Sequence, residues 1–395
     1  MTRFVNRRQF LCRTGVGLAS FSALSLAGRV HLFGSDAPKF EIMETSLIAR
    51  HPGIYYGWPT VGIHPTTSEL FVVASGGREG HVCPFGRVDF IRSKDLGKTW
   101  TWPQTILDGP MDDRDSGVLV TKKGTILVTT FTSDAYLGIL NEELKKRADG
   151  EKGDFDDERL ERWLSVHNRI TDEERKKELG AWMLRSTDNG VNWTAKYATP
   201  YNSPHGPIEC SDGRLLYPGR NFYEKEEIAG VAESLDDGVT WNKLAILPTR
   251  EGDKAGYYHE LHGVEAADGT IVVQIRNHNE KNDGETLQTE SADGGKSWSA
   301  PHSIGVWGHP SHLWRLRDGR LVMTYGFRRD PMGNQARISS DNGKSWSDPI
   351  IISGDARITD VGYPSTVQLP DDTLLSVWYE NQGTTVLRMA RWKLF

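Results

Sequence analysis

The stretch Ser291-Ala-Asp-Gly-Gly-Lys-Ser-Trp298 decides the fold, because its pattern of Ser, Asp, Gly and Trp at offsets 0, 2, 4 and 7 occurs five times in the chain. The other copies are SKDLGKTW (93–100), STDNGVNW (186–193), SLDDGVTW (234–241) and SSDNGKSW (339–346). In each copy the Asp can accept backbone N–H bonds within a tight turn, the Gly supplies a positive φ, and the Trp packs back onto the sheet. Such a motif, repeated every 40–50 residues or so, is typical of propellers and other repeat folds.

The copies are evenly spaced once one insertion is set aside. They start 93, 48, 57 and 48 residues apart, and the longest interval contains the segment 134–180, in which 24 of 47 residues are charged. Within this segment, DDERLERWLSV (156–166) and TDEERKKELG (171–180) are typical of short helices, the second capped by Thr171. We expect a helical excursion from a loop of the second blade, either a solvated one or a lid that shapes access to a site.

Hairpins occur throughout the rest of the chain. Their turns are Lys123-Gly124, Asp212-Gly213, Asp268-Gly269, Asp318-Gly319 and Asp371-Asp372, each between apolar runs. The pattern predicts an all-β fold, a six-bladed β-propeller over residues 40–395. Its blades are expected to open at Pro59, near Ser116, at Pro207, near Gly263, at Ser311 and at Ser365. The last blade is one strand short, so Phe40–Ala49 is expected to close the ring as its outer strand.

Residues 1–27 are expected to be an export signal. Arg7-Arg8 followed by Phe10-Leu11 resembles the twin-arginine motif, and the apolar run from Val16 to Ala27 is too short to cross a bilayer. Cleavage after Ala27 would leave a periplasmic or extracellular protein that is free of the membrane. The alternative is an N-terminal anchor that is not removed.

The net charge limits the binding partners, and the number of cysteines limits the possible disulfides. A formal net charge of −6 with mixed signs disfavours nucleic acid, whose phosphates need a basic surface, but allows a small anionic ligand at a local basic site. Cys12 falls in the predicted signal, and Cys83 and Cys210 remain as either one disulfide or two thiols. No cofactor is indicated, and the oligomeric state is left open.

One face of a propeller collects the starts of the inner strands and the ends of the second strands around the axis. The inner-strand starts carry Trp58, Asp115, His205, Glu209, His259, Glu260, His262, His309, His312 and Tyr363. The second strands end in Arg78, Arg220, Arg276, Arg328, Arg329, Tyr379 and Glu380. Because guanidinium groups bind carboxylates as planar forks, this set predicts a site that accepts anionic ligands.

These motifs resemble the sialidase (neuraminidase) superfamily over essentially the whole of residues 40–395. HELHGVEAADGTIVVQIRNH (259–278) resembles the segment in which a Glu precedes the inner strand and an Arg ends the second strand, which implies Glu260 and Arg276. DVGYPSTVQLPDDTLLSVWYEN (360–381) resembles the segment with the catalytic tyrosine, which implies Tyr363. Asp115 and Arg78 also lie where the family has an Asp and an Arg.

The resemblance implies an exo-acting glycoside hydrolase that cleaves terminal, acidic sugars from glycans. A sialoside has a carboxylate on its anomeric carbon, which would repel an anionic nucleophile, so sialidases attack with a tyrosine whose proton a glutamate draws away. Here that pair would be Tyr363 and Glu260, with Asp115 and His81 as further catalytic groups. The implied substrate contacts are Arg78, Arg276, Arg328, Arg220, His205, His262, His309 and Trp58.

Two features depart from the family pattern. The motif Phe-Arg-Ile-Pro falls on Tyr56-Gly57-Trp58-Pro59, so Gly57 stands where the first arginine of the carboxylate clamp would be. No acid/base aspartate follows Arg78 at the expected distance, and Glu79 or His81 is the candidate replacement. The substrate is therefore expected to be a terminal sugar that need not be sialic acid.

Two other functions fit the same residues. One is a uronate polysaccharide lyase that uses histidine and tyrosine, and the other is a glycan-binding propeller without catalysis. The histidines also raise the alternative of a divalent metal site, although no H-E-x-x-H spacing is present. The histidines concerned are His205, His259, His262, His309 and His312.

Overall fold

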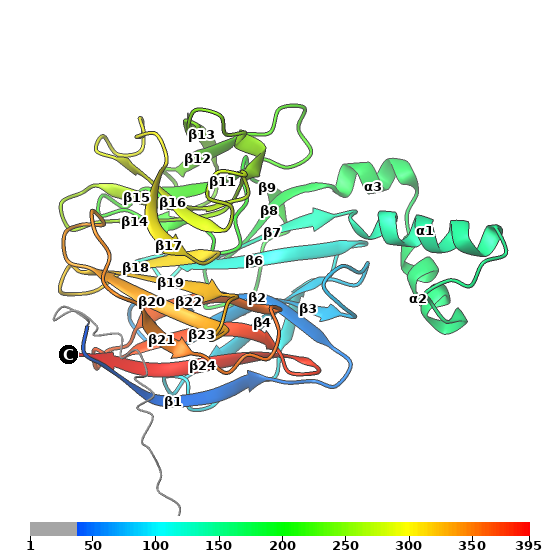
Figure 1. Ribbon diagram of the computed structural model, residues 1–395, viewed down its shortest axis with the longest axis horizontal. Coiled ribbons are helices and arrows are strands. Elements are labelled where there is room, and N and C mark those ends of the chain that lie inside the picture. Colours follow the sequence, from blue (N-terminus) through cyan, green and yellow to red (C-terminus); the bar gives the residue numbers. More distant parts are fainter. Residues whose placement is uncertain (1–37) are drawn as a thin grey trace, which may run out of the picture. The chain divides into compact units, whose positions relative to one another are not determined.

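The computed structural model describes residues 38–395, so the predicted export signal, with Arg7-Arg8 and Cys12, lies outside the described residues. Within this range, 24 strands form six four-stranded antiparallel sheets. Each sheet is one blade, and the predicted six-bladed β-propeller is confirmed (Figure 1).

Each blade has four strands, ordered from the axis outward. The first is β2 (Tyr55–Ile63), β3 (Leu70–Arg78), β4 (Arg87–Ser93) and β5 (Gln104–Leu107). The second is β6 (Asp112–Val120), β7 (Ile126–Ser133), β8 (Gly180–Ser186) and β9 (Tyr197–Ala198). The third is β10 (Ile208–Glu209), β11 (Leu215–Arg220), β12 (Ala229–Ser234) and β13 (Asn242–Ile246).

The other three blades follow the same order. The fourth is β14 (Tyr258–Glu265), preceded by the short helix η1 (Ala255–Tyr257), then β15 (Ile271–Asn277), β16 (Glu285–Ser291) and β17 (His302–Trp307). The fifth is β18 (Ser311–Arg315), β19 (Leu321–Phe327), β20 (Gly333–Ser339) and β21 (Ile350–Ser353). The sixth is β22 (Val361–Gln368), β23 (Leu374–Asn381), β24 (Thr385–Leu394) and β1 (Phe40–Ala49).

The ring is closed by β1, as predicted. It pairs antiparallel with β24, from Phe40 opposite Leu394 to Ala49 opposite Leu387. Figure 1 shows β1 in blue beside β24 in red, so the first and last strands of the propeller share one sheet. The closure supplies the fourth strand that the sixth blade lacks in the C-terminal part of the sequence.

Each repeated motif is a turn held by its Ser and Asp side chains. In all five copies the Asp accepts the backbone N–H of the residue at offset 6 at 2.9 Å. The Ser hydroxyl accepts the N–H of the Gly at offset 4 at 2.8 or 2.9 Å. That Gly has a φ between 76° and 90° in every copy, a conformation that glycine adopts without steric cost.

The motif tryptophans are half-buried and pack against the preceding blade as well as their own. Trp193, from the second blade, meets Phe90 of the first edge-to-face, with ring centroids 5.3 Å apart. Trp346, from the fifth, donates its indole N–H to Gln288 Oε1 of the fourth at 3.0 Å. The motif therefore joins neighbouring blades, which the sequence pattern alone did not indicate.

We expect Trp193→Ala to lower the free energy of unfolding by about 2–3 kcal/mol, below the 3–5 kcal/mol or so typical of a fully buried aromatic residue. Urea denaturation followed by circular dichroism measures this. Trp102→Ala is the matched control, because that indole is 76% exposed and its loss should change stability by less than about 0.5 kcal/mol. Equal effects of the two changes would contradict this role for the motif.

Six of the seven hydrophobic clusters in residues 38–395 lie between consecutive blades. Alternate residues of one strand enter different clusters. In β3, Val72 and Ala74 face the sixth blade, whereas Phe71 and Val73 face the second. This two-residue alternation explains why the central strands are apolar throughout.

The insertion in the second blade contains three helices, between β7 and β8: α1 (Tyr136–Ala148), α2 (Asp157–His167) and α3 (Asp172–Glu178). Thr171 caps α3 in a capping box with Glu174, as predicted in part. The sequence analysis missed α1, which has no side-chain cap and no acidic residue in its first turn, so the usual start signals are absent. No helix in the described part of the chain is long and apolar enough to cross a bilayer.

Candidate active site

Four inner strands have a bulge at the same place. The register of β2, β6, β14 and β22 shifts next to the axis, and one residue in each bulge has a positive φ. These residues are Trp58 (54°), Asp115 (50°), Glu260 (47°) and Tyr363 (54°). A non-glycine residue in this conformation costs on the order of 1–3 kcal/mol, and such strain is concentrated at functional sites.

The bulges also explain an error in the predicted blade boundaries. These four strands begin at Tyr55, Asp112, Tyr258 and Val361, whereas the sequence analysis placed the openings at Pro59, Ser116, Gly263 and Ser365. The two or three residues before each bulge were not recognised as strand, because the alternation of side chains restarts after the bulge.

Tyr363, Glu260 and Arg276 meet at the axis, although they come from the sixth and fourth blades. The Tyr363 hydroxyl donates a short hydrogen bond to Glu260 Oε1. Arg276 Nη1 lies 2.6 Å from Glu260 Oε2 and 3.0 Å from the Tyr363 hydroxyl oxygen. The three side chains therefore form one closed triangle of hydrogen bonds.

The protonation states in this triangle follow from burial and charge. Burial and the neighbouring Glu260 charge raise the pKa of Tyr363 well above its usual value. Burial alone would raise the pKa of Glu260, but the Arg276 charge and the hydrogen bonds from Tyr363 and Arg276 bring it down to about 2. At neutral pH the tyrosine is thus a neutral phenol that is hydrogen-bonded to a carboxylate, the arrangement needed to remove its proton during attack.

Asp115, on β6, is the titrating carboxyl group of the site. Burial raises its pKa to about 7, with the Arg114 charge opposing and the Glu260 charge adding to the shift. A carboxyl group with this pKa gives up or takes up a proton near neutral pH, as a general acid/base requires.

We expect Asp115→Asn to stabilise the protein at pH 8 but not at pH 4. The folded carboxyl keeps its proton up to a pKa of about 7, whereas an unfolded one loses it near pH 4, so wild-type stability falls as the pH rises between about 4 and 7. The variant does not undergo this loss, which is about 4 kcal/mol for a difference of about three pKa units, and should be more stable than the wild type by up to about this amount at pH 8. Urea denaturation at several pH values measures it, and Asp108→Asn, at an exposed position, should show no such trend.

Arg78 has a structural role, because all its hydrogen bonds are to Asp112 and to the loop that follows β3. It is 1% exposed and forms a bidentate ion pair with Asp112. Its other hydrogen bonds are to the carbonyl oxygens of Gly80 and His81, at 3.3 and 3.0 Å. Arg78 therefore holds the loop that follows β3, and does not project into the open part of the site.

Glu79 anchors the helical insertion to the same loop. Its carboxylate accepts hydrogen bonds from three α2 side chains, Arg159, Arg162 and Trp163. This removes Glu79 as the acid/base candidate. His81, the other candidate, lies edge-on to Trp58 at 5.1 Å, with Nδ1 3.2 Å from the Tyr55 hydroxyl. Desolvation and the Arg114 charge lower the pKa of His81 to about 4.

The other predicted contacts form a polar rim. Arg220 Nη1 lies 2.7 Å from His259 Nε2, and Arg328 Nε donates to the Val361 carbonyl oxygen at 3.0 Å. Burial and the Arg276 charge lower the pKa of His309 to about 3. Trp58 is 1% exposed and lies beneath this rim.

Arg114 is the site residue that the sequence analysis missed. Its guanidinium carbon lies 4.8 Å from the centre of the Trp58 ring, and its only sequence signal is that it directly precedes Asp115. The Nε atoms of Arg220 and Arg276 are buried without a hydrogen-bond partner among the described residues, whereas Arg114 Nε lies 3.8 Å from Asp112 Oδ2. Buried donors are nearly always paired, with protein, water or ligand, so water or a bound group is expected to accept hydrogen bonds from Arg220 Nε and Arg276 Nε.

The structure places His205 and His262 away from the arginines. They form a group with His312 deeper in the channel, where their exposed fractions are 1%, 4% and 4%. No group of three or more His, Cys, Asp or Glu within residues 38–395 has the arrangement of a metal site. Cys83 and Cys210 are both buried and free, and they lie in separate clusters.

Comparisons with known proteins agree with this architecture. The family model described as "BNR repeat-like domain" matches residues 156–377. A search of functionally curated proteins gave no significant match. A solved structure of a protein of unknown function from Dyadobacter fermentans is similar, with a TM-score of 0.71 and 24% identity over 90% of this chain and 99% of that one.

Two solved sialidases are also similar. Trypanosoma rangeli sialidase, solved with the inhibitor DANA, has a TM-score of 0.58 and 17% identity over 90% of this chain and 60% of its own, so this chain spans less than two thirds of that enzyme. The intramolecular trans-sialidase from Ruminococcus gnavus, solved with oseltamivir carboxylate, has a TM-score of 0.58 and 14% identity over 91% of this chain and 97% of its own. At these identities the likeness establishes the fold, a propeller of the sialidase type.

Proposed function

This chain belongs to the family of BNR repeat-like domains, and we propose that it is an exported exo-glycoside hydrolase that removes a terminal, acidic sugar from glycans. The observation that carries the proposal is the hydrogen-bonded triangle of Tyr363, Glu260 and Arg276 on the propeller axis. Export rests on the twin-arginine-like sequence in residues 1–27.

In the proposed first step, the Tyr363 oxygen attacks the anomeric carbon and its proton passes to Glu260. A neutral phenol is the suitable nucleophile for an anionic sugar, because it brings no charge toward the substrate carboxylate until its proton leaves. Arg276 contacts both partners and compensates the charge that develops on the phenolic oxygen.

Asp115 takes the acid/base role in this proposal. With a pKa of about 7, it protonates the leaving glycosidic oxygen as the bond breaks. In the second step it accepts a proton from water, which attacks the glycosyl-tyrosine and releases the sugar with retained configuration. We assign His81, which lies edge-on to Trp58, a contact with the leaving group.

An acidic substrate is supported by the basic groups around the axis. Arg220 and Arg276 each have a buried Nε without a hydrogen-bond partner in the part of the chain that the structure describes. Arg114 lies over the Trp58 ring, and Arg328 lies beside Tyr379, 3.4 Å from its hydroxyl. Gly57 leaves the usual clamp incomplete in the first blade, so we propose an acidic sugar whose carboxylate is bound differently from that of a sialoside.

The lyase alternative needs a histidine base, and the accessible histidines are poorly suited to it. The pKa values of His81, His259 and His309 are lowered to about 4, 4 and 3. Imidazoles with such low pKa values are weak bases for removing a proton next to a carboxylate.

Product masses distinguish the three functions. Purified protein is incubated with sialosides, uronate-containing oligosaccharides and neutral oligosaccharides, and the products are analysed by mass spectrometry. Hydrolysis adds the mass of one water molecule across the cleaved bond, and we expect this result for an acidic substrate. Unsaturated products would support a lyase, and binding without turnover would support a glycan-binding propeller.

A further inference from the structure

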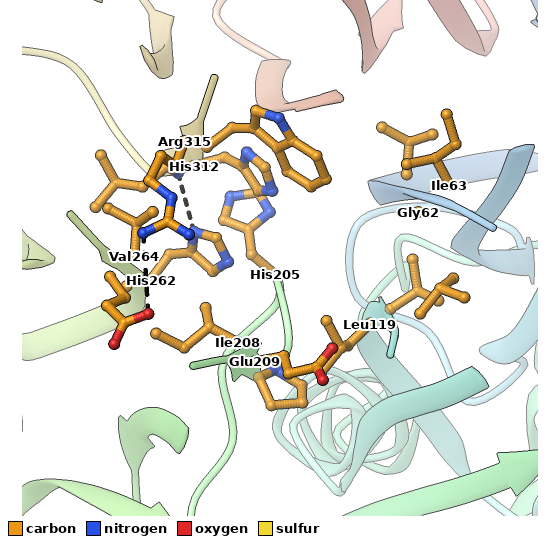
Figure 2. Close-up of a pocket in the computed structure, with 18 of the residues that line it drawn as sticks. Gly62, Ile63, Leu119, His205, Ile208, Glu209, His262, Val264, His312 and Arg315 are labelled. Carbon is orange, nitrogen blue, oxygen red and sulfur yellow. Dashed lines mark hydrogen bonds and ion pairs between the residues drawn. The ribbon is translucent and has the colours of Figure 1, made fainter. Parts of the chain in front are cut away.

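Three imidazole rings form a layer across the central channel. The His262 and His312 rings are stacked with centroids 4.3 Å apart. The His205 ring lies edge-on to both, at 5.5 and 5.2 Å. All three line a cavity of about 330 Å³, and none of Tyr363, Glu260, Arg276 and Asp115 lines it. Figure 2 shows the three rings next to one another among the side chains that line this cavity.

Hydrogen bonds fix which ring nitrogens carry hydrogen. His262 Nδ1 accepts the backbone N–H of Leu313 at 2.9 Å, and His312 Nδ1 accepts that of Thr366 at 3.3 Å. Because burial lowers the pKa of both rings far below the usual value, each is neutral. The single hydrogen of each ring is therefore on Nε2, which is a donor.

His205 has the opposite arrangement. The Thr60 hydroxyl donates to the Pro204 carbonyl oxygen at 2.8 Å, so in its 3.3 Å contact with His205 Nδ1 it must be the acceptor. Burial lowers the pKa of His205 to about 4, and its Nε2 is thus a lone-pair acceptor. That atom is buried with no partner among the described residues.

This set of two donors and one acceptor does not suit a metal ion, because only His205 Nε2 has a free lone pair. The charged residues at the rim of the cavity are engaged in contacts with other parts of the protein. Glu209 accepts the backbone N–H of Lys122 at 2.6 Å, and the Lys122 ammonium group donates to the Cys210 carbonyl oxygen at 3.0 Å. Arg315 lies 3.9 Å from Glu265. Figure 2 shows Glu209 and Arg315 at the edge of the cavity.

The walls of the cavity are apolar. They include Val61, Val118, Ile208, Val264 and Leu313, together with the indole of Trp314. An apolar cavity of about 150 Å³ holds a benzene ring, so 330 Å³ accommodates a substituted ring.

We propose that this cavity binds a small neutral molecule with an apolar body and one hydroxyl group, of the size of a substituted phenol. Its hydroxyl hydrogen is donated to His205 Nε2, and its oxygen accepts the Nε2–H of His262 or His312. The cavity borders the Tyr363 site, because the His205 and Tyr363 ring centroids are 6.4 Å apart, but Tyr363 does not line it. The proposal does not depend on the proposed hydrolase function.

Three fluorinated probes of similar size test the proposed hydrogen bond between the ligand hydroxyl and His205 Nε2. Titration of 4-fluorophenol, 4-fluoroanisole and 4-fluorotoluene, followed by fluorine NMR, gives their dissociation constants. The phenol is expected to bind about tenfold more tightly than the other two, which cannot donate to His205. Equal binding of the three probes, or no saturable binding of the phenol, would overturn the proposal.

Two further measurements locate the site. His205→Phe keeps a ring of similar shape and should remove the preference for the phenol, whereas His302→Phe, at an exposed position on β17, should keep it. A crystal soaked in 4-bromophenol should show bromine in the cavity next to the three rings, a result that needs no variant. Bromine only at other positions, or a phenol preference unchanged in His205→Phe, would overturn the assignment.

Discussion

Tyr363→Phe is expected to lower kcat on the best substrate by about three orders of magnitude, because it removes the oxygen that attacks the sugar. The phenyl ring should pack as before, since Tyr363 is 4% exposed and only its hydroxyl contacts Glu260 and Arg276. Steady-state kinetics measures the effect, and the melting temperature shows that the variant is folded.

Glu260→Gln is expected to have a similar effect, because an amide cannot take up the tyrosine proton. The double variant should be little slower than either single one, as for groups that act as a unit. Tyr325→Phe is the matched control, since it also removes a buried hydroxyl, one that donates to Gln335 at 2.8 Å far from the triangle. A near-normal kcat in Tyr363→Phe, or a loss in Tyr325→Phe of the same size, would contradict the assigned nucleophile.

Deletion of Phe40–Ala49 is expected to have the largest effect on stability. The strand pairs with β24 from Leu387 to Leu394, and β24 contributes Met389, Ala390 and Trp392 to clusters that join the sixth blade to its two neighbours. Loss of the strand exposes this edge and should lower the free energy of unfolding by about 5 kcal/mol or more, much of the stability of a typical domain.

Denaturant unfolding tests the closure. The control is Met43→Thr with Leu47→Thr, two exposed side chains on the same strand (51% and 47% exposed), because it keeps the backbone pairing. The deletion should broaden or abolish the cooperative transition while the control retains it. A deletion variant with an unchanged transition would show that β1 does not close the ring.

The fold could be predicted from the sequence because its signal is repeated. Five copies of one turn motif give the blade period, and the missing strand of the sixth blade follows from counting. The helix α1 was missed because a single amphipathic segment without capping residues gives a weak local signal.

The site could be predicted only in part. Tyr363 and Glu260 at the starts of inner strands, and Arg276 at the end of a second strand, were predicted to meet, and the structure brings them together. Local sequence patterns do not predict contacts between blades. Such contacts determine how deep a side chain lies in the channel and pair Arg78 with Asp112. Arg114 was not predicted for the same reason. The bulge in β6 determines the direction of its side chain, and the sequence does not show the bulge.

Rapid quenching of a reaction mixture, followed by peptide mass mapping, tests the central claim most directly. The proposal predicts a glycosyl group attached to the peptide that contains Tyr363, present during turnover and absent in Tyr363→Phe. It also predicts that the released product is a free sugar formed by addition of water across the glycosidic bond. Turnover without any adduct, or release of an unsaturated sugar, would contradict the account.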